Sequence, residues 1–231
     1  KFEPATTELI KRLLHEVDIF INVGANIGYY CCWALRYGKH VVAFEPIQSN
    51  LRCLCENMRS NGWLDEVEVF PMALGEKVGI AEMYGGGTGA SLISGWAGIP
   101  EDYAELVPVS RLDLVLGHRF EGKQCLIVVD IEGAEKRMLK GAASFLRRNP
   151  PPIWLVEISI AEHQPKGREI NPNLVATFEE FWSRGYESWA VAQPCRRVTR
   201  EELDHVAESG QNTIGSRNFL FIRKDNWDLL P

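Results

Sequence analysis

Residues 18–28 have the sequence DIFINVGANIG, and this stretch decides the fold. Its first part, Asp18–Val23, is short and almost continuously apolar, which is typical of a strand buried on both faces of a parallel sheet. Gly24 and Gly28 follow, and glycine permits the sharp backbone turn by which such a strand passes directly into a helix. The stretch therefore predicts a strand, a tight turn and a helix that runs to about Tyr37.

The rest of the chain repeats this order of strand and helix. Further strands are predicted at His40–Phe44, Val67–Phe70, Leu126–Val129, Ile153–Val156, Tyr186–Ala192 and Asn218–Arg223, a hairpin at Gly79–Tyr84 and Leu106–Leu112, and helices near residues 9–17, 46–61, 134–146 and 174–185. Such alternation indicates an α/β fold, with a doubly wound, mostly parallel, seven-stranded sheet and right-handed crossovers. No helix fits behind the last strand, Asn218–Arg223, which is therefore predicted to be an antiparallel C-terminal edge strand.

The length and composition favour a single domain over residues 1–231. The chain has 231 residues, of which 45% are hydrophobic, and this is enough for one sizeable core. Residues 85–100 contain six glycines and are expected to be mobile. We expect the substrate to be covered by a loop at residues 85–103 and by the connection at residues 160–172.

Charge and cysteine usage restrict the partners. The net charge of -6, without a basic block, argues against a nucleic-acid substrate. The six cysteines have no zinc-binding spacing and are expected to be reduced thiols, as in a cytoplasmic protein. No apolar run reaches the ~18 residues of a membrane span, and no signal peptide is visible, although the chain begins at Lys1. A cytoplasmic location is therefore expected.

The glycine-rich turn and the acid at the end of the second strand indicate a nucleoside-type ligand. Glu45 lies about 20 residues beyond the turn, where a carboxylate can accept hydrogen bonds from ribose hydroxyls. The turn lacks the Gly-x-Gly-x-x-Gly pattern of pyrophosphate binders, because Asn26 stands where a second bare backbone is needed. S-adenosylmethionine has no phosphate, so we predict an S-adenosylmethionine-dependent methyltransferase. The alternative is an NAD-dependent oxidoreductase on a related sheet.

Several motifs together carry a family resemblance. The segments DIFINVGANIGYY, VVAFEPIQSNLRCLCENMRSNG, ALGE, SRLDLVL and VDIEGAEKRMLKGA resemble the FkbM-type methyltransferases from about Asp18 to Glu157. The resemblance implies the Rossmann-like class I methyltransferase fold. It also implies methylation of hydroxyl groups on small molecules such as sugars and polyketides, while a nitrogen acceptor stays an alternative.

The resemblance also assigns cofactor-binding roles. It places Gly24, Asn26 and Gly28 around the methionine part of the cofactor and Glu45 at the ribose. The complete predicted cofactor set is Asn22, Gly24, Asn26, Gly28, Glu45, Pro46, Met72, Ala73, Leu74 and Asp130, with residues 72–74 bordering the adenine. The family usually has an acid where this chain has Asn22, and often a lysine in place of Val128. These departures motivate a further alternative, a cofactor-binding scaffold without catalytic activity.

The predicted catalytic groups lie at the ends of neighbouring strands. Asp130 and Glu132 follow the strand 126–129, and Glu157 ends the next one. Acids gathered in one crevice can include a general base with a raised pKa. They can also bind Mg²⁺ or Ca²⁺, but no metal site is predicted. His163 is a second candidate base, and Ser91 and Trp96 are candidate substrate contacts, Trp96 being the one tryptophan expected to be free to face a substrate.

Overall fold

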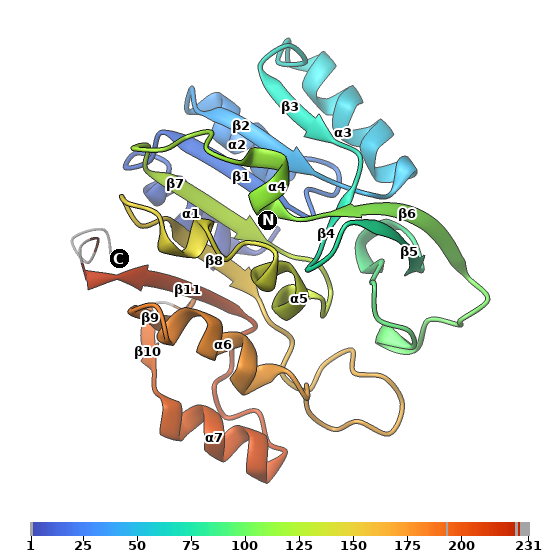
Figure 1. The fold of residues 1–231 in the computed structure, drawn as a ribbon, viewed down its shortest axis with the longest axis vertical. Helices are drawn as coiled ribbons and strands as arrows, with labels where there is room; N and C mark the ends of the chain where they lie inside the picture. Colours follow the sequence, from blue (N-terminus) through green and yellow to red (C-terminus); the bar gives the residue numbers. More distant parts are fainter. Residues whose placement is uncertain (1, 193, 225, 227–231) are drawn as a thin grey trace.

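The computed structural model describes residues 2–192, 194–224 and 226, so the ends of the predicted 1–231 domain lie outside the described residues. Within this part, the centre is an eight-stranded sheet with the order β10-β9-β11-β8-β7-β1-β2-β3 (Figure 1). Its strands are β1 (Ile19–Val23), β2 (His40–Phe44), β3 (Val67–Phe70), β7 (Cys125–Val129), β8 (Ile153–Glu157), β9 (Tyr186–Ala190), β10 (Arg196–Val198) and β11 (Asn218–Arg223). A smaller sheet has the order β4-β6-β5, from β4 (Ala73–Leu74), β5 (Gly79–Tyr84) and β6 (Ala104–Ser110).

The strand count and the edge of the sheet correct the prediction. Strands β3, β2, β1, β7 and β8 pair in parallel, as expected. The last strand, β11, is antiparallel, but it lies between β8 and β9 and not at the edge. The antiparallel edge is β10, a strand that the sequence analysis did not predict and that raises the count from seven to eight.

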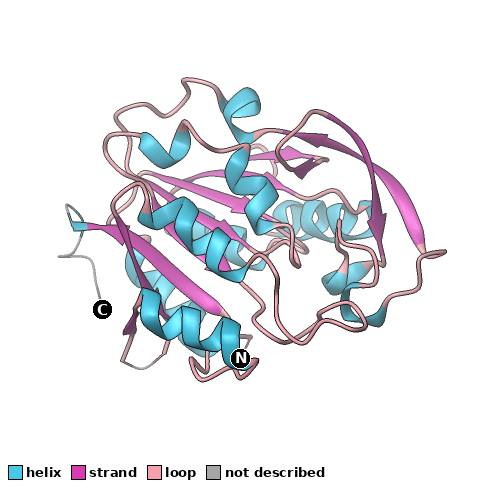
Figure 2. Ribbon diagram, turned by 60° about the horizontal axis from the view of Figure 1, so that its bottom comes forward, coloured by secondary structure: helices cyan, strands magenta, loops and turns pink. Residues whose placement is uncertain are grey.

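Helices cover both faces of the large sheet (Figure 2). They are α1 (Pro4–Leu13), α2 (Tyr29–Arg36), α3 (Gln48–Ser60), α4 (Leu112–Leu116), α5 (Glu135–Lys140), α6 (Leu174–Trp182) and α7 (Arg200–Ser209). One apolar cluster joins the sheet to α1, α2 and α3 through buried side chains such as Leu9, Cys31 and Leu54. The other joins it to α4, α5, α6 and α7 through Leu112, Met138, Phe178 and Leu203 among others. The helix predicted at residues 134–146 is shorter and ends at Lys140. The chain turns there and forms a separate 3₁₀ turn at Phe145–Arg147.

The glycine-rich segment 85–103 connects β5 to β6 and folds back on itself. Ser91 forms a bridge with Tyr84 and is completely buried. The Ala97 N–H donates to the carbonyl oxygen of His163 at 2.7 Å, so the segment is attached to the loop that follows β8. In Figure 1 both segments lie on the side of the molecule to which the arrowheads of β7 and β8 point. Across the described ranges, no helix is long and apolar enough to cross a membrane.

Candidate functional site

Three turns meet at the carboxyl ends of the central strands. The Gly24 N–H, after β1, donates to the carbonyl oxygen of Phe44 at the end of β2, at 2.9 Å. The Asp130 N–H, after β7, donates to the carbonyl oxygen of Val23 at 3.0 Å. These bonds extend the parallel ladder by one residue and fix the glycine turn, Glu45 and Asp130 at one edge of the sheet. This edge is where open α/β sheets bind their ligands.

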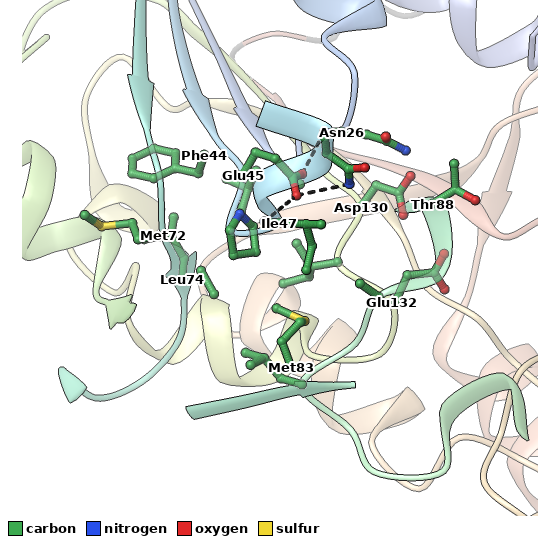
Figure 3. Close-up of a pocket in the computed structure, with 18 of the residues that line it drawn as sticks. Asn26, Phe44, Glu45, Ile47, Met72, Leu74, Met83, Thr88, Asp130 and Glu132 are labelled. Atoms are coloured by element: carbon green, nitrogen blue, oxygen red, sulfur yellow. Dashed lines mark hydrogen bonds between the residues drawn. The ribbon is translucent and has the colours of Figure 1, made fainter. Parts of the chain in front are cut away.

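A cleft of about 580 Å³, here called the central cleft, opens at this edge. Its lining consists of Val23, Gly24, Asn26, Phe44, Glu45, Pro46, Ile47, Asn50, Met72, Ala73, Leu74, Met83, Gly87, Thr88, Ala90, Leu92, Asp130, Ile131 and Glu132. Figure 3 shows Phe44 and Met72 at one end and Asp130, Thr88 and Glu132 at the other. The cleft therefore has an apolar end and an acidic end.

Most of the predicted cofactor residues reach this cleft. Those that line it are Gly24, Asn26, Glu45, Pro46, Met72, Ala73, Leu74 and Asp130. Asn22 does not, because it is 2% exposed within β1, and its Oδ1 accepts a weak hydrogen bond from the Cys31 thiol. Gly28 also stays outside and precedes α2, packed against Leu54 and Met58 of α3.

Glu45 is the most strongly held side chain of the cleft (Figure 3). Its Oε2 accepts from the Asn26 N–H at 2.8 Å, while Oε1 accepts from the Ile47 N–H at 2.9 Å and from Asn50 Nδ2 at 3.2 Å. Burial raises the pKa of Glu45, and these hydrogen bonds oppose that increase. A carboxylate offers about four acceptor positions, so three donors leave one for a ligand. The expectation that Glu45 receives hydrogen bonds from both ribose hydroxyls thus requires Asn50 to move.

Asn50 is a cleft residue that the sequence analysis missed. Its amide group donates to Glu45 and also, at 2.9 Å, to the carbonyl oxygen of Gly87 in the segment 85–103. It is 6% exposed although it is polar. The sequence did contain a signal for Asn50. It is a polar residue in the first turn of the helix after Glu45, on the inward face of that helix. The other missed lining residues of this segment, such as Thr88 and Leu92, had none, because only the folded chain brings them to the sheet.

Asn26 is a lining residue of the central cleft that has an unused acceptor. Its backbone φ is 52°, in the left-handed region that asparagine tolerates better than most residues. Its Oδ1 is buried without any hydrogen-bond partner, and the residue lines the central cleft. Because a buried acceptor without a partner is costly, this oxygen fits a site whose ligand carries a hydrogen-bond donor.

Four carboxyl groups interact around the acidic end of the cleft, and two of them, Asp130 and Glu132, line it. Burial, and then the charges of Glu157 and Glu132, raise the pKa of Asp130 well above its ordinary value. Burial likewise raises the pKa of Glu157 to about 7, against the opposing effect of Arg217, whose Nη1 lies 3.5 Å from Glu157 Oε1. Glu135, 2% exposed in the first turn of α5, has its pKa raised to about 7 by burial. The site therefore concentrates negative charge and favours a cation or a proton.

The raised pKa of Glu135 predicts that the free energy of unfolding falls as the pH rises, and that Glu135→Gln makes this fall smaller. The folded-state pKa of Glu135 lies above its unfolded value of 4.5, so its contribution is fully present below pH 4.5 and is lost as the pH rises through about 7. Over this pH range the free energy of unfolding falls by an amount on the order of 3 kcal/mol. In the wild type, Glu135 Oε1 accepts a hydrogen bond from the Gly133 N–H at 2.8 Å. Glutamine stays neutral at every pH, and its amide oxygen can accept the same hydrogen bond.

The measurement is urea unfolding at pH 4.5 and pH 8. We expect Glu135→Gln to match the wild type at pH 4.5 and to exceed its free energy of unfolding at pH 8. The exposed Glu208→Gln is the matched control and should follow the wild type at both values. A wild type that gains stability relative to Glu135→Gln between pH 4.5 and pH 8 would contradict the prediction.

Glu132 is positioned by residues of two loops. Its Oε2 accepts from Trp96 Nε1 at 2.8 Å, and His163 Nδ1 lies 3.6 Å from the same oxygen. The Ser91 hydroxyl donates to the Glu132 carbonyl oxygen. Asp130 and Glu132 thus share the cleft, whereas Glu157 and His163 lie outside its lining.

The expected exposure of Trp96 is wrong. Trp96 is 2% exposed, and its ring packs so closely on Gly133 that a Cβ there would lie 2.5 Å from Trp96 Cζ3. Ser91 is completely buried, and its hydroxyl also accepts from the Ile93 N–H at 2.9 Å. In this structure both residues hold Glu132 in place, and a direct substrate contact by either stays a prediction. Among the described residues, no group of three or more His, Cys, Asp or Glu side chains is arranged to hold a metal ion.

Comparisons with known proteins give one family match and similarities to solved structures. The family model of the methyltransferase FkbM domain matches residues 22–188. The solved structure of a methyltransferase FkbM from Methylobacillus flagellatus KT is 20% identical, with 70% of this chain and 48% of that chain covered and a TM-score of 0.44. This chain therefore spans about half the length of that protein.

A second solved structure supports the fold alone. The ribosomal protein L11 methylase from Lactobacillus delbrueckii subsp. bulgaricus is 11% identical, with 95% of this chain and 77% of that chain covered and a TM-score of 0.51. No protein of curated function matches the sequence. The fold of this chain is thus similar to that of a known methylase.

Proposed function

The chain belongs to the methyltransferase FkbM family, and from this premise we propose that it binds S-adenosylmethionine in the central cleft and methylates a hydroxyl group of a small molecule. The observation that carries the proposal is the convergence of Gly24, Glu45 and Asp130, from three strand ends, on one cleft with an apolar and an acidic end. We also propose that the chain forms one methyltransferase domain, in which residues 85–103 cover the substrate.

The lining of the central cleft suits the parts of the cofactor in order. Phe44 and Met72 provide apolar surface for the adenine at one end. Glu45 retains one acceptor position for a ribose hydroxyl. Asn26, with its unpartnered Oδ1, can accept from the methionine ammonium. The acidic end favours the positive charge of the cofactor, because opposite charges attract strongly where water is excluded.

The reaction requires alignment of the acceptor and removal of its proton. When bound, S-adenosylmethionine supplies an activated methyl group that the acceptor oxygen attacks in line, the C–S bond breaking as the C–O bond forms. We assign the role of general base to Asp130, which takes the hydroxyl proton; its raised pKa brings it closer to the pH at which it works. Glu132 orients the acceptor, and Glu157 and His163 are positioning residues, acting through Asp130 and Glu132 respectively.

Cofactor binding tests the proposal independently of any acceptor. We expect S-adenosylhomocysteine to bind in isothermal titration with a Kd on the order of 10 µM, or roughly -7 kcal/mol. Replacing Glu45 with glutamine is expected to weaken it about 10- to 100-fold, because the amide NH₂ then faces a donor, either the Asn26 N–H or that of Ile47. Glu16→Gln, at an exposed position beyond the end of α1, should leave the affinity unchanged.

The same titration separates the alternatives. Binding of NAD without binding of S-adenosylhomocysteine would overturn the proposal in favour of an oxidoreductase. Tight cofactor binding without methyl transfer to any member of a panel of hydroxylated sugars, sugar phosphates, hydroxy acids and aromatic alcohols would favour the catalytically silent scaffold.

A further inference from the structure

A second cleft lies beside the central one. Its volume is about 840 Å³, and its lining is Tyr84, Leu92, Ile93, Ser94, Trp96, Gly133, Arg137, Gln164, Pro165, Arg168, Asn171, Pro172 and Asn173. Leu92 lines both clefts, and Glu132 of the central cleft precedes Gly133 of the second. Trp96 lies between the two clefts, because it belongs to the lining of the second cleft and its Nε1 donates to Glu132 of the central cleft. We call this second cleft the arginine cleft.

The charges of the arginine cleft are opposite to those of the central cleft. Arg137 projects from α5, and Arg168 lies in the loop after β8. Within the described part of the chain, neither guanidinium group has an ion-pair or hydrogen-bond partner, although the protein as a whole is acidic. Next to the wall of the cleft, Lys136 Nζ donates to Asn173 Oδ1 at 3.2 Å, while Glu82 and Glu101 accept from the hydroxyls of Tyr84 and Ser94. Among the described residues, the charged side chains that line the cleft itself are Arg137 and Arg168.

We propose that the arginine cleft binds an oxyanion, a carboxylate or a phosphate, carried by the methyl acceptor. Guanidinium groups present planar pairs of N–H donors that match such oxyanions, and they form charge-assisted hydrogen bonds with them. The inference rests on the proposed function, since it treats the two clefts as parts of one active site. It narrows the acceptor from any small hydroxyl compound to an acidic one, such as a hydroxy acid, a sugar acid or a sugar phosphate.

The charges of the two clefts also orient the methyl acceptor. An anionic group is repelled from Asp130 and Glu132 and attracted to Arg137 and Arg168. Its hydroxyl then lies on the side of Leu92, which lines both clefts, and faces the acidic end of the central cleft, where the proton is to be removed. The two clefts would thus bind opposite ends of one substrate, and alignment of this kind is a large part of what a methyl-transfer site contributes.

The test is a titration of the protein with sodium phosphate, and separately with sodium acetate, at constant ionic strength. Amide and arginine side-chain NMR shifts report binding. We expect saturable shifts in the wild type at millimolar concentrations and an affinity at least ~10-fold lower in the double variant Arg137→Gln/Arg168→Gln. Saturation by phosphate alone indicates a phosphate-bearing acceptor, and saturation by acetate as well extends the site to carboxylates.

The control variant is Arg147→Gln. Arg147 is exposed and lines a separate basic cleft with Lys123, near the amino ends of β7 and β8. Loss of phosphate binding in Arg147→Gln but not in the double variant would overturn the inference, and so would the absence of saturation in the wild type. Binding of S-adenosylhomocysteine is measured on the same samples. If it is unchanged in the double variant, that variant is folded, and if it is absent in the wild type, the proposed function fails while the oxyanion site is judged separately.

Discussion

Replacing Gly24 with alanine is expected to lower the free energy of unfolding by at least ~3 kcal/mol and to weaken binding of S-adenosylhomocysteine more than ~30-fold. A Cβ at this position would lie 1.9 Å from the carbonyl oxygen of Asp130 and 2.9 Å from its carbonyl carbon. Both are backbone atoms, so no side-chain rotation can relieve the overlap. The turn after β1 and the turn after β7 would have to separate, and the central cleft lies between them.

The matched control is Gly38→Ala. Gly38 has a φ of 68°, close to the 79° of Gly24, but a Cβ there meets no atom within 4 Å. This substitution carries the left-handed strain alone and should cost about 1 kcal/mol without effect on cofactor affinity. Urea unfolding and isothermal titration measure the two quantities. Equal losses in both variants would mean that backbone strain, and not the contact with Asp130, accounts for the requirement for glycine.

The parallel half of the fold could be predicted from the sequence because its signals are local. The run at Ile19–Val23 is apolar throughout, and a strand buried on both faces needs that composition. The position of β11 could not be predicted in the same way, because its pairing with β8 and β9 joins distant segments. The composition of β11 was nevertheless informative, because Phe219–Ile222 is continuously apolar. These four residues are buried, and a central strand needs such an apolar run more than an edge strand does.

The missed elements β10 and α7 are largely polar. Only Val198 of β10 is buried, and Leu203 and Val206 are the buried residues of α7. Such short apolar patterns give weak periodicity. A capping signal was present, because the Thr199 hydroxyl accepts from the Glu202 N–H, as the threonine-to-glutamate spacing of a capping box predicts.

Glu45 and Asp130 could be located in the cleft from the sequence because each follows a strand directly. The contribution of the segment 85–103 could not, since it depends on tertiary contacts such as those of Ser91 and Trp96 with Glu132. The segment was expected to be a mobile lid on account of its glycines. Its mobility and its covering role stay predictions, and its buried residues Ser91 and Trp96 connect it to the acidic end of the central cleft.

The second large effect is expected at Asp130, where asparagine should lower kcat about 10²- to 10⁴-fold. Asparagine has nearly the same shape but cannot accept the acceptor's proton. A base with a raised pKa predicts that the wild-type rate increases with pH through that pKa, because the carboxyl group must first lose its proton. Methyl transfer from labelled S-adenosylmethionine to the best acceptor of the panel measures both the rate and its pH dependence.

The comparison with Glu157→Gln separates the base from its neighbour. Glu157 lies outside the lining of the central cleft, and its charge helps to raise the pKa of Asp130. Removing that charge should lower the pKa of Asp130, so the rising limb of the rate profile moves to lower pH while the plateau changes less than about 10-fold. An Asp130→Asn enzyme that keeps its turnover would exclude Asp130 as the base. An unchanged pH profile in Glu157→Gln would exclude the coupling, because the charge that raises the pKa of Asp130 would then have no effect on the rate.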